Sequence, residues 1–219
     1  YPAHHITAGQ GGSVVVNSPK VTVAARSISE WGRSCYCEPG KSNTCGKRFE
    51  WDFEGMPKGW DHKYTYDTIG YNLRATDMQA AIMCAQADRI QIIVRRRREN
   101  FQFLYHRLKS LEDFFILPKI HPLADPSPYA FPLTIRSGSG LRRDKIVAHL
   151  EAANIETRPI YGGNMLRQPG FKNIRHRISG SLENTDYIME NAFFVGVHPG
   201  LTEEMLDYVA QKIREAVSI

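Results

Sequence analysis

The sequence predicts an α/β fold. Candidate strands and helices alternate through residues 129–219, and residues 76–111 carry apolar side chains at helical spacing. The apolar fraction of 42% is that of a folded protein, and 219 residues suffice for one large or two small domains with a buried core. These observations favour packed layers of helix and sheet.

The first third of the chain shows little regular structure. Residues 13–16 are a short β-branched run before the turn residues 17–19, which predicts a strand, and residues 21–28 read as a helix. Residues 34–66 are rich in Gly, Pro, Cys and aromatic side chains and have no period. A long irregular segment is uncommon unless it is functional or held by something, so we expect its cysteines to hold it.

A long helix is expected over residues 76–111, with a break near Arg89. Thr76 can cap its first turn, with Gln79 as the reciprocal partner. The apolar positions near helical spacing are Met78, Ile82, Ala85 and Ile90. Residues 118–128 contain four prolines and read as a linker.

Beyond the linker the elements alternate. We expect, in chain order, a strand at 130–135, a helix at 141–153, a strand at 155–160, a helix at 184–191, a strand at 192–197 and a helix at 202–217. Thr202 would cap the last helix. The predicted division is a large domain over 1–117 containing the cysteine loop and the long helix, a linker over 118–128, and a small α/β domain over 129–219.

The formal net charge of +5 and the run Arg95–Arg98 raise the question of nucleic-acid binding. Because the run lies in a helical pattern and is followed by Glu99, a solvated helix face or a subunit contact is the simpler interpretation, and we expect no nucleic-acid partner. No apolar run approaches the ~20 residues that span a bilayer. We therefore expect a cytoplasmic protein without membrane insertion.

Three cysteines lie close together in the irregular segment. Cys35, Cys37 and Cys45 form a C-x-C-x₇-C pattern, and soft thiolate ligands select zinc or iron–sulfur groups. The alternatives are unpaired or disulfide-linked thiols, although a Cys35–Cys37 disulfide would be strained and a reducing compartment disfavours it. Cys84 lies among apolar residues of a helix and is expected to be a small buried hydrophobe.

Residues 2–12 resemble the signature of the DegT/DnrJ/EryC1 sugar aminotransferases, in which a lysine binds pyridoxal phosphate covalently. His4 occupies the lysine position. Further segments resemble one branch of this family, the CDP-4-keto-6-deoxyhexose 3-dehydrases. These segments are Trp31–Phe49, Ile69–Ala81, Arg158–Asn164 and Val195–Thr202.

The resemblance implies the C-terminal half of an aspartate-aminotransferase-like, fold type I transferase that depends on pyridoxal phosphate (PLP). It also implies an activity: pyridoxamine phosphate (PMP), bound without a covalent anchor, serves the removal of the C3 hydroxyl from a CDP-linked 4-keto-6-deoxyhexose. Such chemistry begins 3,6-dideoxyhexose synthesis for lipopolysaccharide O-antigen. His4 would be the base, because an imidazole exchanges protons near neutrality.

The resemblance further implies a [2Fe–2S] cluster on Cys35, Cys37 and Cys45, with a fourth ligand outside this chain, and a flavin and iron–sulfur reductase as electron donor. In a homodimer, Asn72 and Arg74 would reach the cofactor phosphate of the other subunit; the alternative is a turn that caps the following helix. Arg158 and Asn164 would lie on the substrate side, or have only a structural role.

Two other functions stay open from sequence. One is a cluster-free 3-dehydrase that also uses His4 and PMP but regenerates its cofactor with glutamate. The other is a non-catalytic remnant that folds or dimerises without a cofactor. Because the resemblance places most of the phosphate cradle in a preceding half, we expect the chain by itself to be an inactive fragment.

Overall fold

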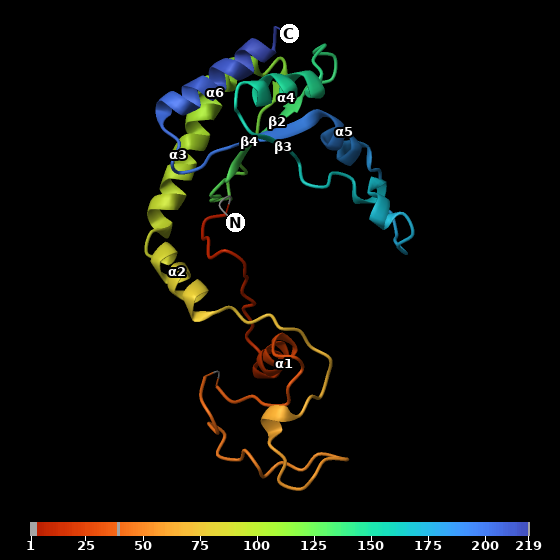
Figure 1. Ribbon diagram of the computed structural model, residues 1–219. Coiled ribbons are helices and arrows are strands. Elements are labelled where there is room, and N and C mark those ends of the chain that lie inside the picture. The colour runs from red at the N-terminus through yellow and green to blue at the C-terminus, as the bar shows by residue number, and fades with distance from the viewer. Residues whose placement is uncertain (1–3, 39, 219) are drawn as a thin grey trace. The chain divides into compact units, whose positions relative to one another are not determined.

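The computed structural model describes residues 4–38 and 40–218. Contacts divide the chain into two compact units: a sheet unit, Tyr1–Thr7 with Ala85–Ile219, and a loop unit, Ala8–Cys84. Figure 1 labels the helices α1 to α6 and the strands β2 to β4. This division falls near residue 85, because the second part of the long helix and a short strand before residue 118 both pack with the C-terminal sheet. The domain boundary predicted at residues 118–128 stays a prediction.

The sheet unit is built on four antiparallel strands in the order β1-β2-β4-β3. Their bounds are β1 Phe115–Ile116, β2 Ala130–Ile135, β3 Thr157–Pro159 and β4 Ala192–Gly196. Leu133 pairs with Phe193, and Val195 lies between Phe131 and Thr157. Because side chains alternate along a strand, these paired residues share one face of the sheet.

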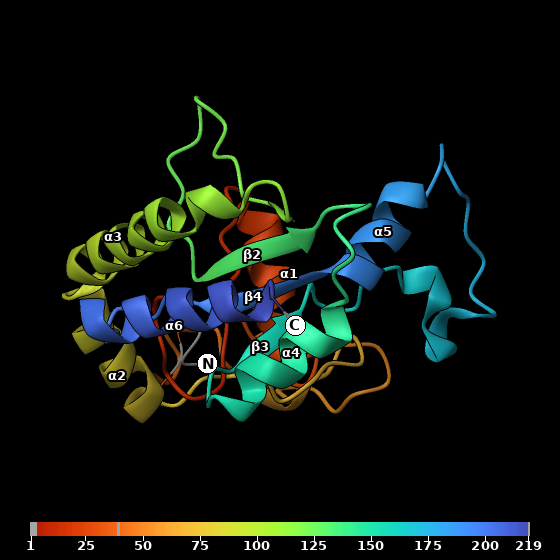
Figure 2. The ribbon, with the colours of Figure 1, turned by 90° about the horizontal axis from the view of Figure 1, so that it is seen from above.

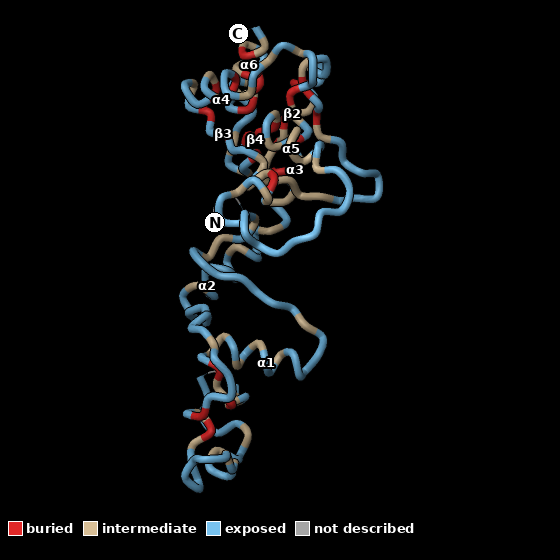
Figure 3. Tube along the Cα trace, turned by 90° about the vertical axis from the view of Figure 1, so that its right-hand side faces the viewer, coloured by how far each residue is buried: buried red, intermediate tan, exposed pale blue. Residues whose placement is uncertain are grey.

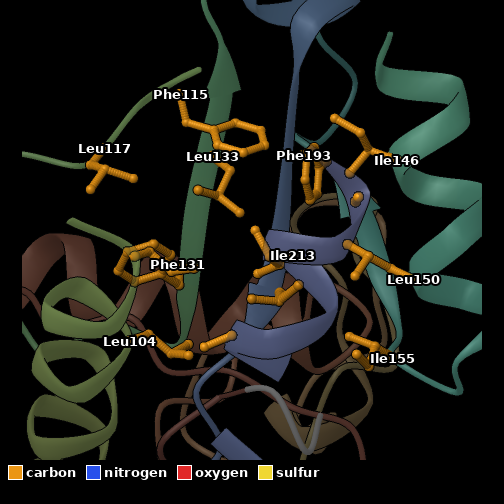
Figure 4. Packing of buried hydrophobic residues seen from close by; sticks show 14 of the residues in the cluster. Leu104, Phe115, Leu117, Phe131, Leu133, Ile146, Leu150, Ile155, Phe193 and Ile213 are labelled. Atoms are coloured by element: carbon orange, nitrogen blue, oxygen red, sulfur yellow. The ribbon is translucent and has the colours of Figure 1, made fainter. Parts of the chain in front are cut away.

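Helices cover that face. The helices α3 (Ile90–Leu108), α4 (Arg143–Ala152) and α6 (Glu203–Ala216) lie side by side above the strands (Figure 2). Figure 4 shows the helix residues Leu104, Leu150 and Ile213 in one apolar cluster with the strand residues Leu133 and Phe193, all of them fully buried. Burying apolar side chains between these two layers is the main source of stability of the unit.

The sequence predicted most of these elements. The long helix is broken as expected, into α2 (Asp77–Ala87) and α3. The backbone N–H of Thr76 donates to Gln79 Oε1 and the backbone N–H of Gln79 donates to Thr76 Oγ1, which is a capping box. The helix α5 spans Glu183–Asn191. One-turn helices occupy Lys109–Leu111, Met165–Arg167 and Pro169–Phe171. Strand β1 was not predicted from sequence, since two residues carry no periodic signal.

The loop unit contains α1 (Pro19–Ser29) and the one-turn helix η1 (His62–Tyr64). The strand predicted at residues 13–16 is wrong: this segment is irregular, and Val14 and Val15 are 79% and 89% exposed. A β-branched run forms a strand only where a partner supplies backbone hydrogen bonds. Among the described residues of this unit the buried ones are Gly32, Ser34, His62 and Thr65, so no apolar side chain is buried (Figure 3).

Gly32 is expected to be essential to the loop unit. Its φ is +81°, and a Cβ there would lie 1.8 Å from the carbonyl oxygen of Thr68. Gly32→Ala combines left-handed strain of about 1–2 kcal/mol with a backbone overlap that must be relieved. We expect hydrogen exchange at Ser34 and Asp67 to accelerate strongly. Gly55→Ala is the control, because φ is +77° there and nothing lies within 4 Å of the added Cβ; equal effects of the two changes would contradict the packing argument.

Thr202 caps α6 as predicted. Its Oγ1 accepts a hydrogen bond from the backbone N–H of Met205 at 3.2 Å. Thr202→Ala is expected to destabilise the sheet unit by about 1 kcal/mol, because one N–H at the start of the helix loses its acceptor. Denaturant unfolding of the chain measures the change. Thr202→Ser keeps the hydroxyl and should restore most of the stability.

No described helix has the length and apolar character needed to cross a membrane.

Candidate functional site

The irregular segment brings the predicted thiols together around a histidine. Ligand atoms of Cys35, Cys37 and His62 all lie within 4.8 Å of one another. The Nε2 atom of His62 is 3.2 Å from Cys45 Sγ and 4.0 Å from Cys37 Sγ. Three thiols beside one imidazole suit zinc or an iron–sulfur group, so the cysteines fit a soft metal centre.

Backbone hydrogen bonds hold the segments that carry Cys35 and Cys45. Arg33 bridges Tyr66, and the N–H of Ser34 donates to the carbonyl of Thr65 at 3.0 Å. This pairing places Cys35 close to η1. In the other segment the N–H of Lys47 donates to Cys45 Sγ at 3.3 Å across a turn. Backbone N–H···S bonds of this kind stabilise thiolates at metal centres.

The electrostatics differ between the two neighbouring thiols. Burial opposes ionisation of Cys37, but hydrogen bonds with Thr44, Cys45 and Cys35 outweigh it and lower the pKa of its thiol to about 7. Burial raises the pKa of Cys35. Since the thiolate is the form that binds metals, Cys37 is the more readily available ligand of the two at neutral pH.

His62 is the member of the cluster that sequence reasoning missed. It is the only histidine between residues 6 and 105, and it follows Asp61, a helix-capping residue. A lone histidine after a capping aspartate, inside an irregular segment with three cysteines, was the signal that could have indicated His62 as a neighbour of the thiols. Cys84, expected to be buried, is exposed on α2 and lies outside this group of close ligand atoms. Its neighbours on that helix face are likewise exposed.

His4 lies in the sheet unit, and its segment is anchored there. The carbonyl of His4 accepts a hydrogen bond from Arg97 Nη2 at 3.2 Å. The next side chain, His5, contacts Ser127 Oγ through Nε2 at 2.5 Å; burial and then the charge of Arg97 lower its pKa. The side chain of His4 is exposed. An accessible imidazole on a tethered backbone is suited to proton transfer.

Asn72 and Arg74 lie in the loop unit beside the end of α1. Asn72 forms an isolated bridge with Glu30, and Arg74 Nε is 3.4 Å from Glu30 Oε1. Both predicted cofactor residues are exposed. A guanidinium that is 46% exposed with one carboxylate nearby has donors left for a phosphate, so the pair fits the anion of the predicted cofactor. Their role stays a prediction.

The two predicted substrate residues behave differently. Arg158, on β3, is paired with Glu156 and donates to the carbonyl of Thr157 at 2.8 Å. Asn164 is buried; its Oδ1 accepts from the N–H of Leu166 and its Nδ2 donates to Asp186 Oδ1 at 2.8 Å. These contacts serve the local fold, and a substrate role for either residue stays a prediction.

The arginine run makes contacts within the chain. Arg95 and Arg96 pair with Glu99, and Arg98 pairs with Asp125 at 2.8 Å. A groove of about 1100 Å³ lies between α6 and the β3–β4 side of the sheet. None of the predicted site residues lines it.

The model of the DegT/DnrJ/EryC1/StrS aminotransferase family matches residues 1–214. The chain belongs to this family. Among curated members, the lipopolysaccharide biosynthesis protein RfbH of Salmonella typhimurium is 47% identical over 98% of this chain and 49% of its own length. A dTDP-4-dehydro-2,6-dideoxy-D-glucose 3-dehydratase of Saccharopolyspora spinosa is 44% identical over 100% of this chain and 47% of its own. The chain thus spans about half the length of these DegT/DnrJ/EryC1/StrS relatives.

Solved structures of the family share the fold. The Escherichia coli GDP-4-keto-6-deoxy-D-mannose-3-dehydratase with bound hydrated PLP superposes with a TM-score of 0.81 at 24% identity, over 96% of this chain and 52% of that one. This likeness confirms the predicted fold class, part of a fold type I transferase of the DegT/DnrJ/EryC1/StrS family.

Proposed function

We propose that this chain contributes to an enzyme that removes the C3 hydroxyl of a nucleotide-linked 4-keto-6-deoxyhexose, using PMP and a [2Fe–2S] cluster. The observation that supports it most is the convergence of Cys35, Cys37 and Cys45 on His62. Thiolates have no use in a sugar transamination, whereas a deoxygenation consumes two electrons that an iron–sulfur group can deliver. The two curated relatives are named for lipopolysaccharide synthesis and for a sugar 3-dehydratase.

The residues of the chain would divide the work. His4 would take a proton at the reacting carbon and return one to the departing hydroxyl. Asn72 and Arg74 would hold the cofactor phosphate in a homodimer, and the three cysteines would hold the cluster. When bound, PMP supplies an amine for the C4 ketone and a ring that withdraws electrons as the C3 oxygen leaves.

The loop unit supports a metal in a second way. It buries no apolar side chain among its described residues, and one of its buried residues, His62, faces the thiols of Cys37 and Cys45. A segment without a hydrophobic core is commonly held by a metal or by packing against further protein. We propose that the [2Fe–2S] cluster and the remaining half of the enzyme both contribute to the folding of the loop unit.

A labelling experiment tests the proposal. The full-length protein is given PMP and a CDP-4-keto-6-deoxyhexose carrying ¹⁸O at C3, with dTDP- and GDP-linked sugars in parallel. We expect loss of the label to water without added glutamate, and deoxygenated product once a flavin and iron–sulfur reductase supplies electrons. Turnover that needs glutamate but no iron would favour the cluster-free 3-dehydrase. If the protein neither binds the cofactor nor releases the label, the non-catalytic remnant would be favoured.

A further inference from the structure

His62 has two ring nitrogens in very different surroundings. The residue is 0% exposed. Its Nε2 faces the sulfurs of Cys45 and Cys37 at 3.2 Å and 4.0 Å. Its Nδ1 is buried and has no hydrogen-bond partner among the described residues.

The protein holds the ring in this orientation without help from the cysteines. Asp61 caps η1 by accepting from the N–H of Lys63, and Arg48 fixes Asp61 with two hydrogen bonds of 2.8 Å and 2.6 Å. The N–H of His62 donates to the carbonyl of Arg48. Trp51 stacks on the imidazole with ring centroids 4.3 Å apart and planes 21° apart. The ring is therefore preorganised toward the sulfurs.

This geometry determines which nitrogen carries the proton. A metal-bound thiolate can only accept a hydrogen bond, so Cys45 and Cys37 offer acceptors to Nε2. Nδ1 faces no acceptor in the described part of the chain, and a buried N–H without a partner is costly. The tautomer with the proton on Nε2 satisfies the one donor that the neutral ring has.

The surroundings of Nδ1 also disfavour His62 as a metal ligand. Binding a metal through Nε2 would move the proton to Nδ1, where the histidines of metal centres normally find a carboxylate, a carbonyl or a water. No such group of the described residues lies there. The imidazole is thus placed to donate a hydrogen bond to the sulfurs and not to bind the metal.

We propose that in the metal-loaded protein His62 donates an Nε2–H···Sγ hydrogen bond to Cys45, shared with Cys37, and thereby raises the reduction potential of the iron–sulfur group. A hydrogen bond to sulfur stabilises the reduced state, which carries the extra negative charge. His62 is a positioning residue, since it acts through the thiolates. This inference rests on the proposed function, because it requires the cluster.

The test uses the full-length protein loaded with ferrous iron and sulfide. His62→Phe keeps an aromatic ring against Trp51 but has no donor, whereas His62→Gln keeps an N–H. We expect His62→Phe to retain the iron content and visible spectrum of the wild type. At a fixed applied potential its oxidised-to-reduced ratio should rise about tenfold, which is about 59 mV for one electron. His62→Gln should recover part of the shift, and His106→Phe, an exposed histidine on α3, should show none.

Pulsed electron paramagnetic resonance with ¹⁵N-histidine separates the outcomes. A weak nitrogen coupling that disappears in His62→Phe supports the hydrogen bond. An unchanged potential beside a normal spectrum overturns it, and so does a strong, ligand-type coupling or loss of iron from both variants. Absence of any iron–sulfur spectrum in the wild type would instead overturn the proposed cluster, and with it this inference.

Discussion

His4→Lys in the full-length protein is expected to lower sugar dehydration by roughly 10²–10⁴-fold, the usual contribution of a general acid or base. The ordinary pKa of a histidine is about 6.5 and that of a lysine about 10.4, so a lysine is protonated at neutral pH unless its surroundings shift it. When PLP, the aldehyde form of the cofactor, is supplied, a lysine amine at this position would also bond to it covalently with release of water. Label loss from the C3-¹⁸O substrate measures the first effect. Added mass after borohydride reduction measures the second.

The change should leave the local structure intact. One anchoring contact of residue 4 joins its backbone carbonyl to Arg97, and that contact survives a change of side chain. His4→Asn separates the two effects, because it removes the base without providing an amine. His5→Asn is the neighbouring control and should keep dehydration. Dehydration that persists in both position-4 variants would exclude His4 as the essential base.

Cys37→Ser is expected to remove the iron–sulfur spectrum while proton abstraction continues. A serine hydroxyl does not ionise near neutrality, whereas the pKa of the Cys37 thiol lies at about 7, so the substitution replaces an available thiolate with a neutral hydroxyl. Iron content and visible absorbance measure the loss of the cluster. Incorporation of solvent deuterium at the carbon that His4 would deprotonate measures the proton transfer, which needs His4 and not the iron–sulfur cluster.

Cys84→Ser is the matched control. Cys84 is exposed on α2 and lies outside the group of close thiols, so the iron content of the Cys84→Ser protein should equal that of the wild type. A cluster that survives Cys37→Ser would exclude Cys37 as a ligand. Loss of both the spectrum and the proton transfer would mean that residues 34–66 serve chiefly to hold the structure.

Local signals in the sequence predicted the helices and strands of the sheet unit well. The capping pairs at Thr76 and Thr202 form as expected, and the helix breaks next to Arg89. Caps and apolar periodicity are properties of a few neighbouring residues, so a sequence displays them directly. The expected strand at residues 13–16 failed for the opposite reason, since a strand depends on a partner from elsewhere in the chain.

Association between distant segments could not be predicted in the same way. Strand β1 exists because Phe115 and Ile116 pair with Ile135 and Thr134 across the proline-rich segment. That pairing, together with α3 packing on α6, joins the residues before the proline-rich segment to the same compact unit as the C-terminal sheet. Such contacts close long loops, and their energy comes from packing that no local pattern records.

The sequence by itself determined the histidine in the lysine position, the C-x-C-x₇-C spacing and the family that these motifs indicate, because each depends only on residue type and order. Only the tertiary structure decided that His62 joins the cysteines, with one ring nitrogen against sulfur and the other facing no partner among the described residues. His62 follows Cys45 by 17 positions in the sequence. Their contact depends on the Arg48–Asp61 ion pair and on stacking with the Trp51 ring. These are tertiary contacts, so the spacing of residues in the sequence does not reveal them.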